Sequence, residues 1–172
     1  MNAALVLTVI GPDRPGLVEA LAQTVASHGA NWLESRLAHL SGHFAGMVRV
    51  SVPSDRAEEL AAALGALEDL RVLVETAGST RESDDRALVL ELLGQDRPGI
   101  VREVSSALAA RGVNVEELET SCSPAPMSGE TLFRARARLR LPRDTPEGEL
   151  REALEKLGDE LMVDVQFDDE GK

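Results

Sequence analysis

The sequence predicts an α+β protein made of two βαββαβ units, each with an antiparallel sheet and both helices on one face of that sheet. Two observations predict this fold. The chain contains nearly the same segment twice, GPDRPGLV at residues 11–18 and GQDRPGIV at residues 94–101. Each copy follows a short apolar run and precedes a Gly-x-Asn segment, at residues 29–31 and 112–114. One long repeat in 172 residues indicates two copies of a small domain rather than a solenoid.

In the first copy, the spacing of apolar residues predicts each element in turn. An apolar, β-branched run is typical of a buried strand, whereas Leu17, Leu21 and Val25 fall at helical spacing until Gly29, which favours a helix end. Two alternating segments around residues 41–43 predict a hairpin. The expected elements are a strand at 5–10, a helix from Pro15, strands at 32–40 and 44–52, a helix from Pro53 and a strand at 71–75.

The second copy repeats this order with one insertion. Its expected elements are a strand at 88–93, a helix containing Ile100 and Leu108, strands at 115–121 and 132–141, a further helix, and a strand at 161–167. Thr145 is expected to cap the last helix, with Pro146 at its first position. About six extra residues around 123–129, including two prolines and a glycine, predict an irregular loop. We expect domains at 1–79 and 88–168, a linker at 80–87 and an acidic tail at 169–172.

Composition narrows the classes of function. The formal net charge of −12 disfavours direct binding to nucleic acid, and 2% aromatic residues offer no platform for stacking bases. A single cysteine excludes an internal disulfide and fits a reducing compartment. The sequence has no leader pattern and no apolar run of about 18 residues, so we expect a cytoplasmic protein that does not enter a membrane.

The Asp-Arg-Pro-Gly turn has a geometry suited to a small carboxylate. A helix N-terminus presents backbone N–H groups without intrahelical partners, and the helix dipole adds positive charge there. In each copy the proline presets the helical φ, the glycine leaves room for a ligand, and the aspartate can cap the unpaired N–H groups. The alternative is a capped strand-to-helix connection that binds nothing, with Arg14 and Arg97 in solvent.

The strand, the GxDRPG turn, the helix, the Gly-x-Asn segment and the ββαβ remainder together resemble the ACT domain, an amino-acid-sensing regulatory module. Two such units filling nearly the whole chain resemble the family of glycine cleavage system transcriptional repressors. The first segment of formyltetrahydrofolate deformylase is also similar, but the sequence shows no counterpart of that enzyme's catalytic domain. The resemblance implies ferredoxin-like units whose sheets join edge to edge, with glycine or serine bound at the interface between units.

The resemblance also implies which residues contact the ligand. They are Gly11, Asp13, Arg14, Pro15, Gly16, Leu17 and Asn31 in the first copy, and Gly94, Asp96, Arg97, Pro98, Gly99, Ile100 and Asn114 in the second. An amide both donates and accepts hydrogen bonds, so Asn31 and Asn114 can read an ammonium and a carboxylate together. Their alternative role is to favour turn geometry. Pro12 in one copy and Gln95 in the other make the two sites chemically unequal.

Four arginines alternate with apolar residues in the expected strand at 132–141, namely Arg134, Arg136, Arg138 and Arg140. A period of two places them all on the sheet face away from the helices. Cross-strand pairing with Glu91, Glu117 or Glu119 is one interpretation, and a protein partner or nucleic acid are the others. The matching strand of the first copy, at 45–51, is far less charged, so its open face is expected to be covered by another domain or subunit.

Other residue types with reactive side chains give weak signals. His39 and His43 flank the hairpin turn, but no cysteine or carboxylate lies close in sequence to complete a metal site. Cys122 has no adjacent basic residue, which favours an inert thiol. The sequence has no motif for nucleophilic catalysis, phosphate binding or dinucleotide binding. We therefore expect no catalytic residues, no metal and no cofactor.

These observations together predict a cytoplasmic, non-enzymatic regulator that responds to a small amino acid of the glycine or serine class. By resemblance, it regulates genes of glycine cleavage and one-carbon metabolism indirectly, through a protein partner that is a transcription activator. It is expected to contact neither nucleic acid nor membrane, and the prediction allows a homodimer. Two alternatives stay open: a structural or assembly module without ligand sensing, and a regulatory subunit of an amino-acid metabolic enzyme.

Overall fold

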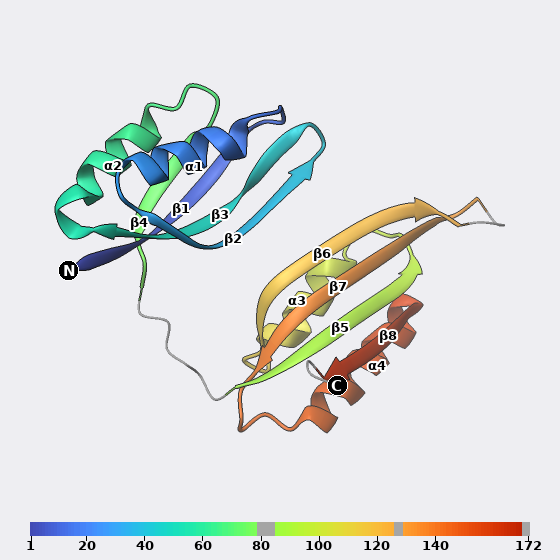
Figure 1. The fold of residues 1–172 in the computed structure, drawn as a ribbon. Helices are drawn as coiled ribbons and strands as arrows, with labels where there is room; N and C mark the ends of the chain where they lie inside the picture. The colour runs from blue at the N-terminus through green and yellow to red at the C-terminus, as the bar shows by residue number, and fades with distance from the viewer. Residues whose placement is uncertain (79–84, 126–128, 170–172) are drawn as a thin grey trace. The chain divides into compact units, whose positions relative to one another are not determined.

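The computed structural model describes residues 1–78, 85–125 and 129–169, with side chains up to residue 167. The chain forms two compact units, Met1–Arg81 and Glu82–Lys172 (Figure 1). Most of the linker predicted at 80–87 and of the tail predicted at 169–172 lies outside the described residues, as does the middle of the loop predicted at 123–129. Within the described residues, no helix is long and apolar enough to cross a membrane.

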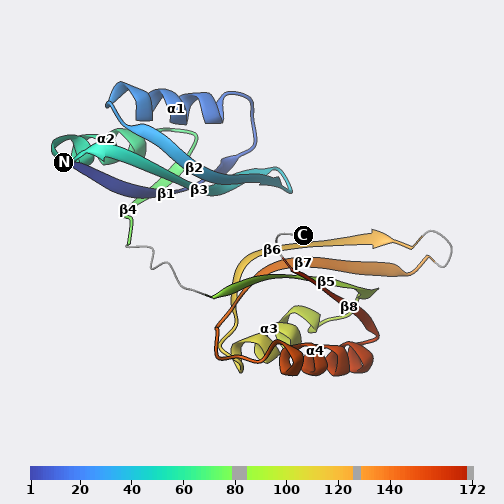
Figure 2. The ribbon, with the colours of Figure 1, turned by 60° about the horizontal axis from the view of Figure 1, so that its bottom comes forward.

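The first unit has the predicted βαββαβ order. Its elements are β1 (Asn2–Pro12), α1 (Leu17–Ser27), β2 (Asn31–Leu40), β3 (His43–Pro53), a short 3-10 turn (Ser54–Arg56), α2 (Ala57–Gly65) and β4 (Arg71–Thr76). The four strands form an antiparallel sheet in the order β2-β3-β1-β4. Both helices cover one face of this sheet and leave the other face open (Figure 2).

The second unit repeats the architecture. Its elements are β5 (Arg86–Gln95), α3 (Ile100–Ala109), β6 (Asn114–Pro124), β7 (Thr131–Leu141), α4 (Glu147–Leu161) and β8 (Val163–Asp169). The sheet order is β6-β7-β5-β8, again antiparallel, with both helices on one face (Figure 2). The predicted fold class is therefore confirmed in both halves of the chain.

Two details of the last helix differ from the prediction. No side chain of the described residues caps α4, and Pro146 is its N-cap in an extended conformation rather than its first helical residue. The Thr145 hydroxyl instead donates to the carbonyl oxygen of Arg111 at 3.3 Å. Leu161 ends α4 and does not begin the closing strand, because Met162 adopts a left-handed conformation with φ 55° and reverses the chain within one residue.

Each unit has its own aliphatic core between its helices and its sheet. Strand β1 alternates strictly, so that Leu5, Leu7 and Val9 face the helices and their neighbours face away. Leu21 of α1 and Leu60 of α2 belong to the same core cluster as these strand residues and are fully buried. Burial of one such side chain contributes about 1.5–3 kcal/mol to the free energy of unfolding. Among the described residues, no polar or charged residue is buried in either core.

Candidate functional site

The Asp-Arg-Pro-Gly turn joins the first strand to the first helix in each unit. Gly16 is the N-cap of α1 with φ 92°, and Gly99 is the N-cap of α3 with φ 100°. Side chains other than glycine are strongly disfavoured in this left-handed region, so the turn needs glycine for its backbone conformation. Both helices therefore begin one residue after the glycine, at Leu17 and Ile100, rather than at the proline.

The aspartates of the two turns do not cap the helices. No described side chain forms a cap hydrogen bond at the start of α1 or α3. The backbone N–H of Asp13 donates to the carbonyl of Gly42 at 2.9 Å, and that of Asp96 donates to the carbonyl of Thr131 at 2.8 Å. These bonds tie each turn to the neighbouring hairpin. The predicted aspartate cap is thus wrong, because no described side chain accepts a cap hydrogen bond at the positive N-terminus of either helix.

Two of the predicted contact residues have a structural role. Gly11 and Gly94 lie at the end of the first strand of each unit, where the closing segment crosses closely. A side chain at Gly11 would collide with the backbone of Asp69. At Gly94 an added Cβ would lie 2.6 Å from the carbonyl oxygen of Met162. Each glycine therefore permits close backbone packing.

A hollow of about 210 Å³ lies beside the first turn. One side is the turn itself with the start of α1, and the other is the segment 67–70 between α2 and β4. Sequence reasoning missed this second side, for which the acidic pair Glu68-Asp69 after an apolar helix was the available signal. The guanidinium of Arg14 forms an ion pair with the carboxylate of Asp69 across the hollow.

The hollow presents charges of both signs. Arg14 and the N-terminus of α1 are positive, whereas Glu68 and Asp69 are negative. A carboxylate bound here would meet the helix N-terminus and Arg14, and an ammonium on the same molecule would meet Asp69. The two carboxylates also work against a multiply charged anion such as a phosphate ester. The arrangement suits a small zwitterion.

One difference between the two turns lies in the first turn of the helix. In both units, the backbone N–H of the fourth residue after the turn glycine donates to the carbonyl oxygen of that glycine, at 2.9 Å. This residue is Ala20 in the first unit and Glu103 in the second. The Glu103 carboxylate lies 3.8 Å from Nη2 of Arg97 and 3.5 Å from Nη2 of Arg102. The second turn thus carries its own carboxylate at the N-terminus of α3.

Neither predicted asparagine lies beside the turn of its own unit. Asn31 begins β2 in register with Ser51, which pairs with Ala4 near the opposite end of β1 from Gly11. Seven residues of strand separate Ala4 from Gly11, about 23 Å. Asn114 occupies the corresponding place in the second unit, in register with Arg140. Within one unit, the asparagine and the turn are therefore not brought together.

The arginine stripe lies on the open face of the second sheet, as expected. Three of its members form cross-strand ion pairs: Arg136 with Glu91 at 3.4 Å, Arg138 with Glu117 at 3.2 Å and Arg140 with Glu116 at 2.9 Å. Arg134 forms no ion pair with any described residue. These contacts support the cross-strand interpretation of the stripe. Exposed pairs of this kind typically contribute about 0–1 kcal/mol each.

The histidines of the hairpin turn make local contacts. Nε2 of His39 accepts a hydrogen bond from the backbone N–H of Gly42 at 3.2 Å, and Nδ1 of His43 lies 3.3 Å from the carbonyl of Ser41. Across the described parts of the chain, no group of three or more histidine, cysteine or acidic residues is placed to hold a metal ion. Cys122 is a free, exposed thiol.

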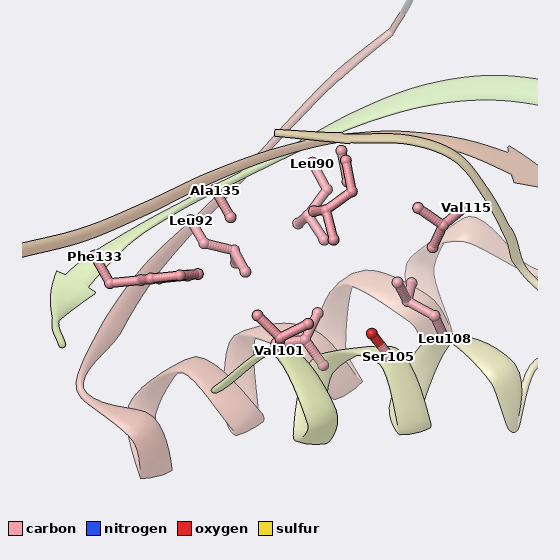
Figure 3. Close-up of a pocket in the computed structure, with 11 residues that line it drawn as sticks. Leu90, Leu92, Val101, Ser105, Leu108, Val115, Phe133 and Ala135 are labelled. Atoms are coloured by element: carbon pink, nitrogen blue, oxygen red, sulfur yellow. The ribbon is translucent and has the colours of Figure 1, made fainter. Parts of the chain in front are cut away.

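A second hollow, of about 20 Å³, lies between α3 and the second sheet. Figure 3 shows Val101, Ser105 and Leu108 of α3 facing apolar side chains of the strands across it. Room for about one water molecule in an apolar setting is a packing space rather than a ligand site. In the first unit the register position of Val115 is taken by Trp32, which packs against the core.

Comparison with known proteins identifies the two units. Models of the ACT domain family match residues 3–76 and residues 88–159. The glycine cleavage system transcriptional repressor of Escherichia coli is 28% identical over 125 residues, 70% of this chain and 66% of the repressor. Phosphoserine phosphatase SerB2 of Mycobacterium tuberculosis is 28% identical over 181 residues, which cover 99% of this chain and 42% of that enzyme. A solved structure of an unknown protein from Galdieria sulphuraria is 34% identical with a TM-score of 0.89, covering 98% of this chain and 99% of that one.

Proposed function

Because this chain belongs to the ACT domain family and carries two ACT domains in tandem, we propose that it is a non-enzymatic regulator that responds to a small amino acid. The observation that carries the proposal is the hollow beside the first turn, with a helix N-terminus and Arg14 on one side and Asp69 on the other. Its volume of about 210 Å³ lies below the roughly 300–1,000 Å³ of pockets for drug-sized ligands, which favours glycine or serine.

The binding mode follows from these charges. The ligand carboxylate accepts from the first-turn N–H groups of α1 and pairs with Arg14, while its ammonium replaces part of the contact between Arg14 and Asp69. The first turn is the site that binds, because the second turn already holds the carboxylate of Glu103. Ligand binding shifts the chain toward the conformation that the ligand prefers, and this shift alters the surface offered to a partner.

The regulated process is inferred from similarity to the glycine cleavage system transcriptional repressor. We place the protein in the cytoplasm, where it acts on genes of glycine cleavage and one-carbon metabolism. The net charge of −12 opposes direct contact with DNA, so its effect passes through a protein partner, a transcription activator.

A thermal-shift screen of the full chain against the proteinogenic amino acids tests the proposal. A ligand at about 100 times its Kd stabilises the folded state by about 2.7 kcal/mol, so glycine or serine is expected to raise Tm. Arg14→Ala is expected to abolish the shift, whereas Arg97→Ala, the matching change in the second turn, is expected to keep it. No shift with any amino acid would favour the assembly module.

A second candidate is a regulatory subunit or segment of an amino-acid metabolic enzyme. It is favoured by the similarity of nearly the whole chain to part of phosphoserine phosphatase SerB2. Hydrolysis of phosphoserine by the purified chain would assign catalysis to it directly. Capture of a metabolic enzyme from cell extract, with an activity that the chain and an amino acid alter together, would support the subunit instead of the gene regulator.

A further inference from the structure

The open face of the first sheet carries an apolar patch at its centre. Ile10, Met47 and Leu73 lie on β1, β3 and β4, and they are 46%, 52% and 60% exposed. Thr8 is in register with both Met47 and Leu73, and Ile10 is two residues further along the same face. The helices cover the opposite face, so nothing in the unit itself covers these side chains among the described residues (Figure 2).

In the second unit, the positions of Met47 and Leu73 are polar or charged, whereas the position of Ile10 holds Leu93, which is 37% exposed. Glu91 is in register with Arg136 and Gln166, just as Thr8 is with Met47 and Leu73. The same three central positions of the open face are therefore Arg-Glu-Gln in one sheet and Met-Thr-Leu in the other. A sheet of this topology is stable with charged and polar residues there. The apolar residues of the first sheet consequently indicate contact with another surface.

We propose that this open face binds the same face of a second copy of the chain. The argument for a second copy comes from the charges that flank Leu73 on β4. Arg71 and Glu75 lie two residues to either side of it on the same face, and both are exposed. They are about 13 Å apart along the strand, too far to pair with each other. Neither forms an ion pair with a described residue.

A twofold axis in the plane of the interface, running across the strands at the level of Thr8, pairs these charges. Strand β4 of one copy then faces β4 of the other in the opposite direction, which places Arg71 over Glu75 of the second copy, twice. The axis also brings Met47 into contact with Met47 of the second copy, and Leu73 into contact with Leu73 of the second copy. It brings Arg36 of the two copies near each other at the sheet edge, where each has its own Glu34 at 3.7 Å.

The size of the face sets the expected affinity. Four strands about 4.8 Å apart and six residues of about 3.3 Å each give a contact of about 400 Å² per copy. A standard stable interface buries about 800 Å² per partner, so this dimer is weak and depends on protein concentration. Two sheets packed in this way lie about 10 Å apart with interdigitating side chains.

Analytical ultracentrifugation of the full chain, from about 1 µM to about 1 mM, tests the proposal. The wild type is expected to change from monomer to dimer over this range. Met47→Arg and Leu73→Gln introduce the residues that the second sheet carries at the same positions, and each is expected to weaken dimerisation at least about tenfold. Val18→Gln is the control, because Val18 is also an exposed apolar residue (46%) but lies on α1.

A charge swap tests the orientation of the two copies. Glu75→Arg places like charges over each other twice and is expected to weaken the dimer at low salt, whereas Arg71→Glu combined with Glu75→Arg is expected to restore it. Circular dichroism and Tm confirm that each variant is folded. A wild type that stays monomeric at every concentration overturns the proposal, as does a dimer that Met47→Arg leaves intact or that Val18→Gln weakens equally. If Glu75→Arg and the double variant Arg71→Glu with Glu75→Arg dimerise with equal affinity, the proposed axis is overturned.

Discussion

The two turns share the residues Asp-Arg-Pro-Gly but differ in the residues around them. Ala20 and Asp69 of the first unit correspond to Glu103 and Met162 of the second. The first turn of α1 has its carboxylate at Glu19, next to Ala20, whereas the first turn of α3 has its carboxylate at Glu103, 3.8 Å from Arg97. An internal carboxylate competes with any ligand carboxylate for the same positive field. We therefore expect the exchange of Ala20 for Glu103 to contribute to selectivity between the two units.

Exchanging these residues is expected to exchange the binding behaviour of the turns. Ala20→Glu supplies the first turn with its own carboxylate, so the binding heat with glycine or serine should disappear. Glu103→Ala removes the internal carboxylate of the second turn and frees Arg97, so a second, weaker binding event should follow. Isothermal titration calorimetry measures both. Unchanged binding by Ala20→Glu would show that the ligand carboxylate lies elsewhere.

The turn glycines also make a prediction for stability. Gly16→Ala forces a side chain into φ 92° and is expected to lower the free energy of unfolding by about 1–2 kcal/mol. Gly65→Ala is the matched control, because Gly65 ends α2 with helical geometry and open space around it. That change is expected to raise stability by about 0.4–1 kcal/mol. Urea unfolding measures both, and a neutral Gly16→Ala would contradict the assigned conformation.

At the residue level, the sequence predicted a strand-to-helix turn at Asp-Arg-Pro-Gly, and the structure has one there in both units. The role of the glycine was not predicted in full: it was expected to leave room for a ligand, whereas the structure gives it a positive φ as the N-cap. The pairing of Arg14 with Asp69 could not be predicted, because 55 positions of chain separate the two residues and their contact depends on how α2 and β4 dock. The aspartate cap was wrong for a local reason: Gly16 and Gly99 are the N-caps, so Asp13 and Asp96 lie three residues before the cap position.

At the scale of elements, the two units differ in how their helices pack on the sheets. Positions filled by Trp32 and Val48 in the first unit hold Val115 and Ala137 in the second, in matching register. The smaller side chains leave the space of about 20 Å³ beneath α3 (Figure 3). Loss of packing contacts around such a space costs stability.

Filling this space is expected to stabilise the second unit. Ala137→Val adds two methyl groups at a lining position and should raise its free energy of unfolding by about 1 kcal/mol. Ala87→Val, on the open face of the same sheet, serves as control and should change stability by less than about 0.5 kcal/mol. Thermal and urea unfolding provide the comparison. A lower stability for Ala137→Val would mean that the space is too narrow and the core is overpacked.

Element order and type were predictable because apolar periodicity is strong in both halves. The hairpin turn at Ser41-Gly42 has φ 49° and 79°, the left-handed pair that a two-residue turn needs. Boundaries were less predictable at α4, where Leu161 satisfies the apolar pattern of a helix and of a strand alike. The left-handed Met162 settles that boundary, and a methionine gives no signal for such a conformation.

At the scale of the whole molecule, duplication produced two ACT domains with different surfaces. One has a hollow beside its turn and an apolar sheet face, and the other has a carboxylate beside its turn arginine and a sheet face of paired charges. The chain that contains both domains has a net charge of −12. The repeat, read with its Gly-x-Asn segments, was enough to predict the family. The division of roles between the units depends on side chains that meet only in the folded chain.

This charge leads to a prediction for DNA binding. The purified chain is expected not to retard promoter DNA at about 0.15 M salt, because its surface repels phosphate and few counterions can be released. A known DNA-binding activator serves as positive control in the same electrophoretic assay. Retardation by the chain alone would contradict indirect action through a partner.

The central claim is that the first turn, and not the second, binds a small amino acid. An NMR titration of the ¹⁵N-labelled full chain with glycine and with serine tests it most directly. We expect saturable shifts of the backbone N–H signals of Gly16, Leu17 and Asp69, with the signals of Gly99 and Ile100 unchanged. Shifts centred on Gly99, or no shifts with either amino acid, would contradict the claim.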